Sequence, residues 1–174
     1  HGVGTVDGIE VELTLAATDR LSLNLGLGHI NSEYRSRGFY SPQTGGIAPN
    51  SPFAYAPDNS ASIGVQYDVP LDSGASWLLV GNYGWSDKYV RDAASQRTPM
   101  DADGNFIFEP AYGVLNARAV FTPSRGNWTA SIWGTNLTDE RYVNGGFDAR
   151  NVWGYDFVVI GRSREVGVGL NVSF

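Results

Sequence analysis

The chain contains no cysteine, which excludes a disulfide framework and metal sites built from thiolates. Charged residues make up only 17% of its 174 residues, below the ~25% of a typical soluble domain. The net charge is −6 and no basic stripe is present, which argues against a nucleic-acid partner. No apolar run approaches the ~18 residues of a transmembrane helix, and no secretory signal is visible. If the chain is exported, we expect its signal upstream of His1.

Residues that favour strands are abundant. The chain has 22 glycines, and aromatic residues reach 13%. Glycine is costly inside helices, whereas tyrosine, tryptophan and valine fit strands. The composition therefore predicts an all-β protein.

Apolar and polar residues alternate with a period of two along about seven segments, which predicts strands. The segments are 9–17, 21–28, 60–69, 77–85, 115–121, 127–132 and 165–174. Each is near or above the ~9–11 residues of a tilted transmembrane strand, whereas strands of soluble domains most often have about 5–6. Strand length therefore favours a membrane barrel.

The connections alternate between short and long. Short links are expected at 18–20, 70–75 and 122–126, and long links at 36–54, 92–109 and 144–160. This alternation is typical of antiparallel up-and-down transmembrane β-barrels with short periplasmic turns. An odd strand number implies missing upstream strands, so we interpret the chain as a fragment. One unrecognised strand would restore an even number.

The alternation gives each strand a polar face and an apolar face. In a large barrel the polar face lines the lumen and the apolar face meets lipid, but a soluble sandwich also alternates. Aromatic residues on the apolar face are expected to form two belts at the membrane interfaces. Those near the short turns are Tyr67, Trp77, Phe121, Trp128 and Phe174; those near the long links are Tyr83, Trp85 and Tyr89.

Three motifs carry a family resemblance. The most specific is Asn136-Leu-Thr-Asp-Glu-Arg-Tyr142; residues 56–61 and 161–167 give weaker matches, and Ser163 departs from the usual pattern. Together they resemble the C-terminal barrel of TonB-dependent outer-membrane receptors.

The resemblance implies a location in the bacterial outer membrane, in a barrel of ~22 strands with an N-terminal plug. We expect the plug, the energy-coupling box and the upstream strands to lie outside 1–174. The implied partners are outer-membrane lipid, TonB through the missing N-terminal region, a small-molecule ligand, and the barrel-assembly machinery. That machinery would read a terminal signal at Gly169, Val172 and Phe174.

The long links combine aromatic residues with arginine, a combination that suits an anionic, partly aromatic ligand such as a ferric chelate. The candidate ligand-binding residues are Tyr40, Tyr55, Arg91, Arg97, Arg150, Trp153 and Tyr155. Packing between loops is the alternative for each of them.

Catalysis is not expected. His1 and His29 stand alone, so no triad or metal cluster is apparent, and we predict no catalytic residue and no cofactor. The spacing of Asp101 and Asp103 resembles the start of a calcium loop but lacks the later bidentate glutamate, which favours an ordinary turn.

The main hypothesis is active import of a scarce solute by an outer-membrane receptor. One rival is a small complete barrel of about eight strands, acting as an adhesin or a structural protein. The other is a soluble β-sandwich that binds carbohydrate.

Overall fold

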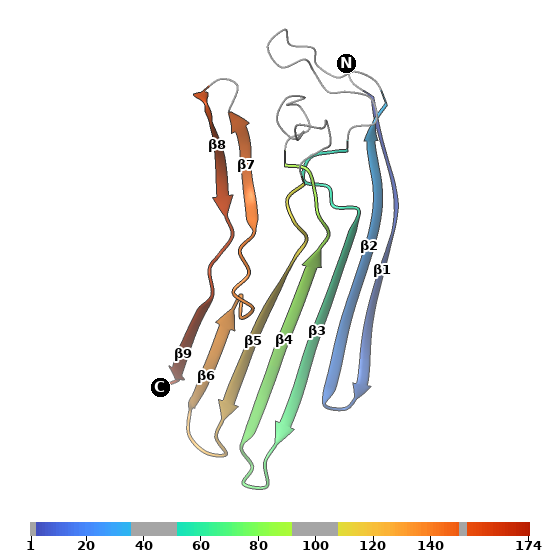
Figure 1. Cartoon of the computed structure of the whole chain (residues 1–174). Coiled ribbons are helices and arrows are strands. Elements are labelled where there is room, and N and C mark those ends of the chain that lie inside the picture. The colour runs from blue at the N-terminus through green and yellow to red at the C-terminus, as the bar shows by residue number, and fades with distance from the viewer. Residues whose placement is uncertain (1–2, 36–51, 92–107, 150–152) are drawn as a thin grey trace.

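A computed structural model of the chain describes residues 3–35, 52–91, 108–149 and 153–174. Seven antiparallel strands form one sheet in the order β1-β2-β3-β4-β5-β6-β9 (Figure 1). They are β1 (Gly4–Thr18), β2 (Leu21–Tyr34), β3 (Asn59–Pro70), β4 (Ser76–Ser86), β5 (Tyr112–Thr122), β6 (Trp128–Thr135) and β9 (Glu165–Val172). The described residues include no helix with the length and apolar character needed to cross a membrane.

The short links form tight turns at one end of the sheet, which we call the short-turn end (Figure 1). The hydroxyl of Thr18 accepts a hydrogen bond from the backbone N–H of Leu21 and closes the first turn at 3.0 Å. Gly74 and Gly126 have φ values of 80° and 97°, which glycine adopts without strain. The opposite end, where the chain passes between β2 and β3, between β4 and β5 and beyond β6, is the long-link end.

The register places the apolar positions of neighbouring strands opposite one another. One cross-strand row runs from Leu21 through Tyr67, Leu79 and Ala119 to Ile132. Because side chains alternate along a strand, the residues between these positions point to the other face. The sheet therefore has an apolar face and a polar face, as the sequence predicts.

No second layer of strands covers the apolar face in the described part of the chain. Val168 on β9 keeps 83% of its surface exposed, and Leu27 and Ile132 are also exposed. A soluble sandwich would bury these side chains against another sheet. The open sheet does not fit the sandwich. Strands β1 and β9 each leave their outer edge unpaired within the described residues, which does not fit a closed small barrel.

Part of the aromatic belt expected near the short turns forms a cluster on the apolar face, and its place at a membrane interface remains a prediction. The ring centroids of Trp77 and Phe121 are 5.1 Å apart, and those of Phe121 and Trp128 are 5.8 Å apart. The expected second belt is wrong for Tyr89, which is only 6% exposed. Strand β4 ends at Ser86, so its alternation does not extend to Tyr89.

The expected long link at 144–160 is also wrong in part, because it contains a separate hairpin. Strands β7 (Val143–Ala149) and β8 (Tyr155–Ile160) pair with each other and stand beside the main sheet (Figure 1). A register shift lies between Val143 and Gly145, and Gly146 has a φ of 137°. This irregularity disrupts the period-two pattern that identified the other strands.

Candidate functional site

A row of polar side chains crosses the polar face from β1 to β5. It runs through Thr14, Asn24, Gly64, Asn82 and Asn116, each directly opposite the next. The Thr14 hydroxyl donates to the Asn24 side-chain oxygen at 3.0 Å, and the Asn116 amide donates to that of Asn82 at 2.8 Å. Each asparagine side chain retains further donor or acceptor capacity, so the row can also bind water or a polar ligand.

Two adjoining hollows lie on the polar face between β1 and β4, and we call them together the trough. The upper hollow is the one nearer the long-link end. It has a volume of about 500 Å³ and includes Glu10, Gly28 and Ser60 in its lining. The lower hollow, of about 410 Å³, includes Glu12 and Asn82. They adjoin because the row of Glu10, Gly28 and Ser60 lies next to the row of Glu12, Gly26 and Ser62 along the strands.

Glycine residues line part of the trough and have no side chains that would fill it. A Cβ atom on Gly26 would lie 2.6 Å from the Ser62 hydroxyl, and one on Gly28 would lie 2.7 Å from the Ser60 hydroxyl. At Gly84 a Cβ would meet nothing within 4 Å, so its absence leaves open space. The trough therefore combines two carboxylates and several hydrogen-bonding groups with apolar residues such as Ile9 and Ile30.

A tyrosine cluster stands at the long-link end. Tyr55, Tyr89 and Tyr112 line a hollow of about 240 Å³ together with Val143. The rings of Tyr55 and Tyr89 are 5.6 Å apart, and the ring of Tyr112 stacks on that of Tyr142 at 4.4 Å. Tyr55 also lines the upper hollow of the trough, so the cluster borders the trough directly.

The cluster also connects the β7–β8 hairpin to the rest of the protein. The hydroxyl of Tyr55 donates to the carbonyl of Gly146 at 2.6 Å, and that of Tyr89 donates to the carbonyl of Val143 at 2.5 Å. Tyr55 has a φ of 56°, a conformation uncommon for a residue with a side chain. Its ring is nevertheless 44% exposed, so it combines a constrained backbone with an accessible aromatic surface.

Burial raises the pKa of Tyr89 from 10.0 to about 12, with further contributions from Tyr112 and Glu109. The neutral hydroxyl is therefore the stable form near neutral pH, and it can continue to donate to Val143. A tyrosine that binds a metal ion as a phenolate would instead need a lowered pKa.

Arg91 forms an ion pair with Glu109, with 3.0 Å between the guanidinium and the carboxylate. Both side chains are largely buried. The pair joins the two ends of the long link between β4 and β5, since Tyr89 and Glu109 also bridge through their backbones. Arg91 was predicted to bind a ligand, and that remains a prediction.

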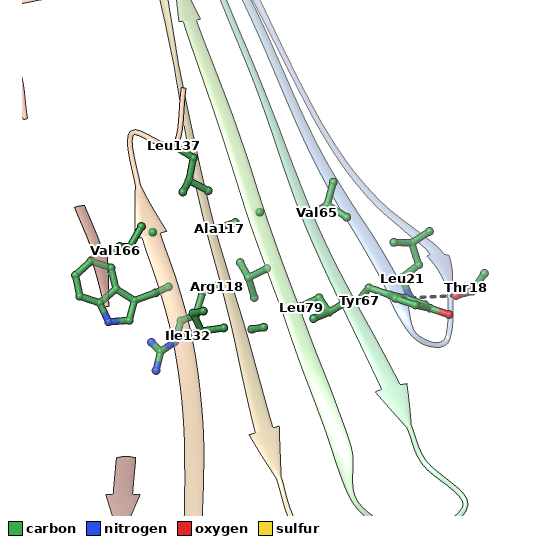
Figure 2. Close-up of a pocket in the computed structure, with 15 residues that line it drawn as sticks. Thr18, Leu21, Val65, Tyr67, Leu79, Ala117, Arg118, Ile132, Leu137 and Val166 are labelled. Carbon is green, nitrogen blue, oxygen red and sulfur yellow. Dashed lines mark hydrogen bonds between the residues drawn. The ribbon is translucent and has the colours of Figure 1, made fainter. Parts of the chain in front are cut away.

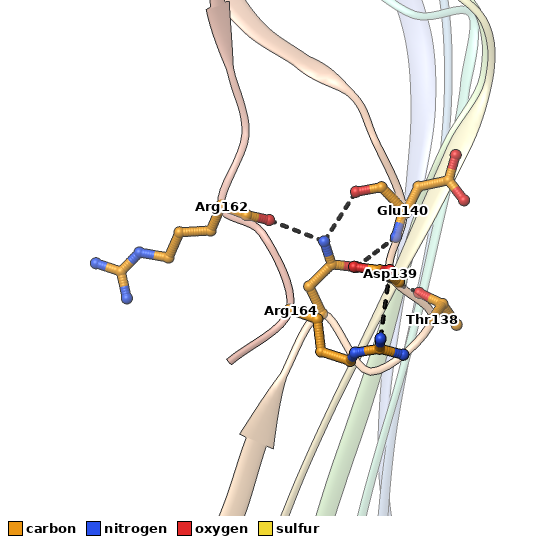
Figure 3. A network of polar contacts seen from close by, with 6 residues as sticks. Thr138, Asp139, Glu140, Arg162 and Arg164 are labelled. Atoms are coloured by element: carbon orange, nitrogen blue, oxygen red, sulfur yellow. Dashed lines mark hydrogen bonds and ion pairs between the residues drawn. The ribbon is translucent and has the colours of Figure 1, made fainter. Parts of the chain in front are cut away.

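The predicted motif at Asn136–Tyr142 forms a compact joint between β6 and the segment that leads into β9 (Figure 3). Asn136 is only 1% exposed. Its side-chain amide donates to the carbonyls of Glu140 and Arg162, both at 2.8 Å, and its side-chain oxygen accepts from the N–H of Glu140 at 2.9 Å. One side chain thus closes its own turn and fixes the approach to the last strand.

The remaining motif residues reinforce this joint. Asp139 lies 3.4 Å from the guanidinium of Arg164, an exposed pair that contributes little by itself. The ring of Tyr142 lies against Gly161, where any Cβ would collide with it. The family motif is therefore accounted for by local structure, and nothing in its contacts indicates a ligand.

The apolar face has its own hollow, of about 890 Å³ (Figure 2). Its floor includes the small residues Gly81, Ala117 and Gly134, which lie opposite one another on β4, β5 and β6. Tyr67 and Ile132 rise at its sides. The lining is almost wholly apolar, as expected of a surface in contact with hydrocarbon.

Other candidates from the sequence are dispersed. Trp153 and Tyr155 stack at 6.2 Å and continue to Phe157 along the hairpin, with their rings exposed. His29 contacts the Asn59 side chain at 2.9 Å, and Asn59 in turn donates to Asp87. Tyr40, Arg97, Arg150 and the Asp101–Asp103 pair lie outside the described residues. Among the residues that are described, no three metal-ligating side chains gather.

Sequence reasoning missed Tyr112 and Tyr142 as partners of Tyr55 and Tyr89. Tyr112 begins β5 and Tyr142 ends the signature motif, so each belongs to a structural element rather than to a long link. The available signal was the alternation along β5, which places Tyr112 on the same face as Asn116.

A family model described as "TonB dependent receptor-like, beta-barrel" matches residues 2–137. Among solved structures, the ferric yersiniabactin uptake receptor FyuA from Yersinia pestis aligns with a TM-score of 0.76 and 16% identity. The siderophore receptor PiuA from Acinetobacter baumannii aligns with a TM-score of 0.73 and 21% identity. The ferric citrate transporter FecA aligns with a TM-score of 0.64 and 19% identity.

The alignments cover 99%, 97% and 98% of this chain but only 24%, 22% and 25% of those proteins. The chain thus spans about a quarter of their length. At these identities the likeness establishes the fold. The matched proteins are transport receptors rather than enzymes.

Proposed function

Because the chain belongs to the TonB-dependent receptor-like β-barrel family, we propose that it forms the C-terminal part of the barrel wall of an outer-membrane import receptor. The transported solute is scarce, such as a ferric siderophore, and TonB supplies the energy through the N-terminal region of the full receptor. Members of this family are outer-membrane proteins. The family match over residues 2–137 is the observation that carries the proposal.

The two faces of the sheet support this role. In a membrane barrel the apolar face meets acyl chains, and the exposed side chains of Leu27, Ile132 and Val168 suit that solvent. The polar face then lines the lumen and presents the trough along the path of a solute. The tyrosine cluster and the exposed aromatic residues of the hairpin lie where the solute would first arrive.

The last strand, β9, carries the residues expected to be bound by the barrel-assembly machinery. Val172 ends β9 opposite Trp128, and Phe174 follows it with its side chain fully exposed. Gly169 lies opposite Ser131 on the polar face. We propose that the barrel-assembly machinery binds this terminal strand through Gly169, Val172 and Phe174.

Uptake by cells tests the proposal. The full-length receptor is expressed in a strain that lacks its other ferric-chelate receptors, and uptake of radioactive iron from several chelates is measured with and without TonB. Accumulation that requires both the receptor and TonB is expected. The proposal fails if no ferric chelate, vitamin or glycan enters in a TonB-dependent manner.

A further inference from the structure

The charges on the polar face are mostly of one sign. On the strands of the main sheet, alternation and register assign five charged residues to this face. Four are carboxylates and one is a guanidinium: Glu10, Glu12, Asp68, Glu165 and Arg118. Within the described strands, the wall that would face the lumen is therefore acidic.

The trough concentrates this charge. Glu10 and Glu12 belong to its lining, and no basic residue does among the described residues. They are two positions apart on β1, so their backbones are separated by about 7 Å along the strand. A solute in the trough would face both carboxylates at once.

The rest of the trough is uncharged and offers hydrogen-bonding groups beside apolar residues. Asn24 and Asn82 offer amide donors and acceptors, and Ser60 and Ser62 offer hydroxyls beside the glycine floor. The hollow between the tyrosines at the long-link end has no charged residue in its described lining. Arg91, the nearby guanidinium predicted to attract an anion, is paired with Glu109 at 3.0 Å.

We propose that the solute conducted along this wall carries no net negative charge and is rich in hydrogen-bonding groups. The inference rests on the proposed import function and narrows its substrate class. Among ferric chelates, tris-hydroxamates fit because three hydroxamate anions balance the charge of Fe³⁺. Carboxylate and catecholate chelates are anionic and would be repelled by Glu10 and Glu12.

Three probes that share one chelate core isolate the effect of charge. They are a linear ferric tris-hydroxamate with a terminal ammonium group, its N-acetylated uncharged form, and its N-succinylated anionic form. Equilibrium binding to the purified full-length receptor is measured at low and high salt. The cationic probe is expected to bind about tenfold more tightly than the anionic one, from two carboxylates acting over several ångströms. The difference should shrink as salt screens the charges.

Glu10→Gln/Glu12→Gln is the test variant, since it preserves the shape of both side chains and leaves them polar while it removes the charge. It should reduce the preference for the cationic probe to about twofold or less, and it should change the affinity for the acetylated probe less than the affinity for either charged probe. Asp19→Asn/Asp72→Asn is the matched control. It removes the same charge from two short turns outside the trough and should preserve the wild-type preference.

Each outcome decides the inference. Equal affinity for the three probes, tighter binding of the succinylated form, or no binding of any of them overturns it. So does a Glu10→Gln/Glu12→Gln receptor that keeps the wild-type preference while its stability alone declines. TonB-dependent uptake is measured separately, so the proposed function can stand when this inference fails.

Discussion

The backbone N–H of Asn136 donates to the side-chain oxygen of Asn116, 2.9 Å away. Asn116 in turn donates to Asn82, so the joint beyond β6 is continuous with the polar row across the sheet. The side chain of Asn136 then reaches the carbonyl of Arg162 before the last strand. This chain of amides links the segment that leads into β9 with the polar face of β4 and β5.

Replacing Asn136 should destabilise the barrel. Asn136→Ala would leave the carbonyls of Glu140 and Arg162 without this donor and should cost about 2 kcal/mol or more. Asn136→Gly is the matched variant, because glycine tolerates the φ of 47° at this position whereas alanine adds about 1 kcal/mol of strain. Denaturant unfolding in detergent should rank wild type above glycine and glycine above alanine. Equal stability of all three would show that the joint is not structural.

The hydroxyls of Tyr55 and Tyr89 should hold the β7–β8 hairpin in place. Tyr55→Phe and Tyr89→Phe each remove one hydrogen bond to β7 and retain the ring. Hydrogen exchange in β7 and β8 should rise, most in the double variant, while β3 and β4 keep their protection. Tyr67→Phe, at the other end of the sheet, serves as the control. Unchanged hydrogen exchange in the double variant would show that these two hydroxyls do not hold the hairpin in place.

Two glycines of the hairpin should differ sharply in their tolerance of alanine. Both Gly146 and Gly154 have positive φ, at 137° and 78°. A Cβ on Gly146 would collide with the backbone carbonyl of Phe157, whereas one on Gly154 would meet nothing within 4 Å. Gly146→Ala should therefore open the pairing of β7 and β8, and Gly154→Ala should cost only the strain of its backbone. Hydrogen exchange of the β8 amides measures the difference, and equal effects would refute it.

The main sheet could be predicted because its strands are long and each has one apolar face and one polar face. The Val166-Gly-Val-Gly-Leu170 pattern of β9 is an example, since every second side chain must be apolar along the whole strand. The short turns were also predictable, because Asp19, Ser73 and Gly74 are residues whose chemistry favours turns.

The hairpin and the tyrosine cluster could not be predicted in the same way. β8 carries Phe157 to Ile160 as an unbroken apolar run, so period two gave no signal there. The contacts of Tyr89 with Tyr55 and Val143 join residues 34 and 54 positions apart, and only the fold brings them together. The motif at Asn136 was recognised as a pattern, but its role as a joint required the structure.

Tyr89 should ionise at a higher pH than an ordinary tyrosine. Its pKa is raised to about 12, so the folded protein retains a proton that an unfolded tyrosine loses near pH 10. Between these values unfolding releases a proton, and stability therefore falls as pH rises from about 10 to 12. Absorbance titration of the phenolate in wild type minus Tyr89→Phe should show one group titrating well above pH 10. A difference curve centred near pH 10 would exclude this environment.

Neighbouring positions on β4 should respond oppositely to arginine. Leu79 lies on the apolar face opposite Tyr67, whereas Val80 points to the polar face beside Gln66 and Arg118. If the apolar face meets hydrocarbon, the cost of Leu79→Arg should lie between the about 2–4 kcal/mol of the membrane midplane and the about 0–1 kcal/mol of the interface, because Leu79 lies opposite Tyr67 of the belt near the short turns. Val80→Arg remains in the aqueous lumen and should cost less than about 1 kcal/mol.

The comparison is made with the full-length receptor refolded into lipid vesicles, by urea titration of tryptophan fluorescence. The two variants add the same side chain to adjacent residues of one strand, so the change in net charge is matched. Because adjacent side chains point to opposite faces, the two arginines meet different solvents, and the one at position 80 also lies opposite Arg118. Similar stabilities for the two variants, or a greater loss for Val80→Arg, would show that the apolar face does not meet lipid. The lumenal assignment of the trough would then fail as well.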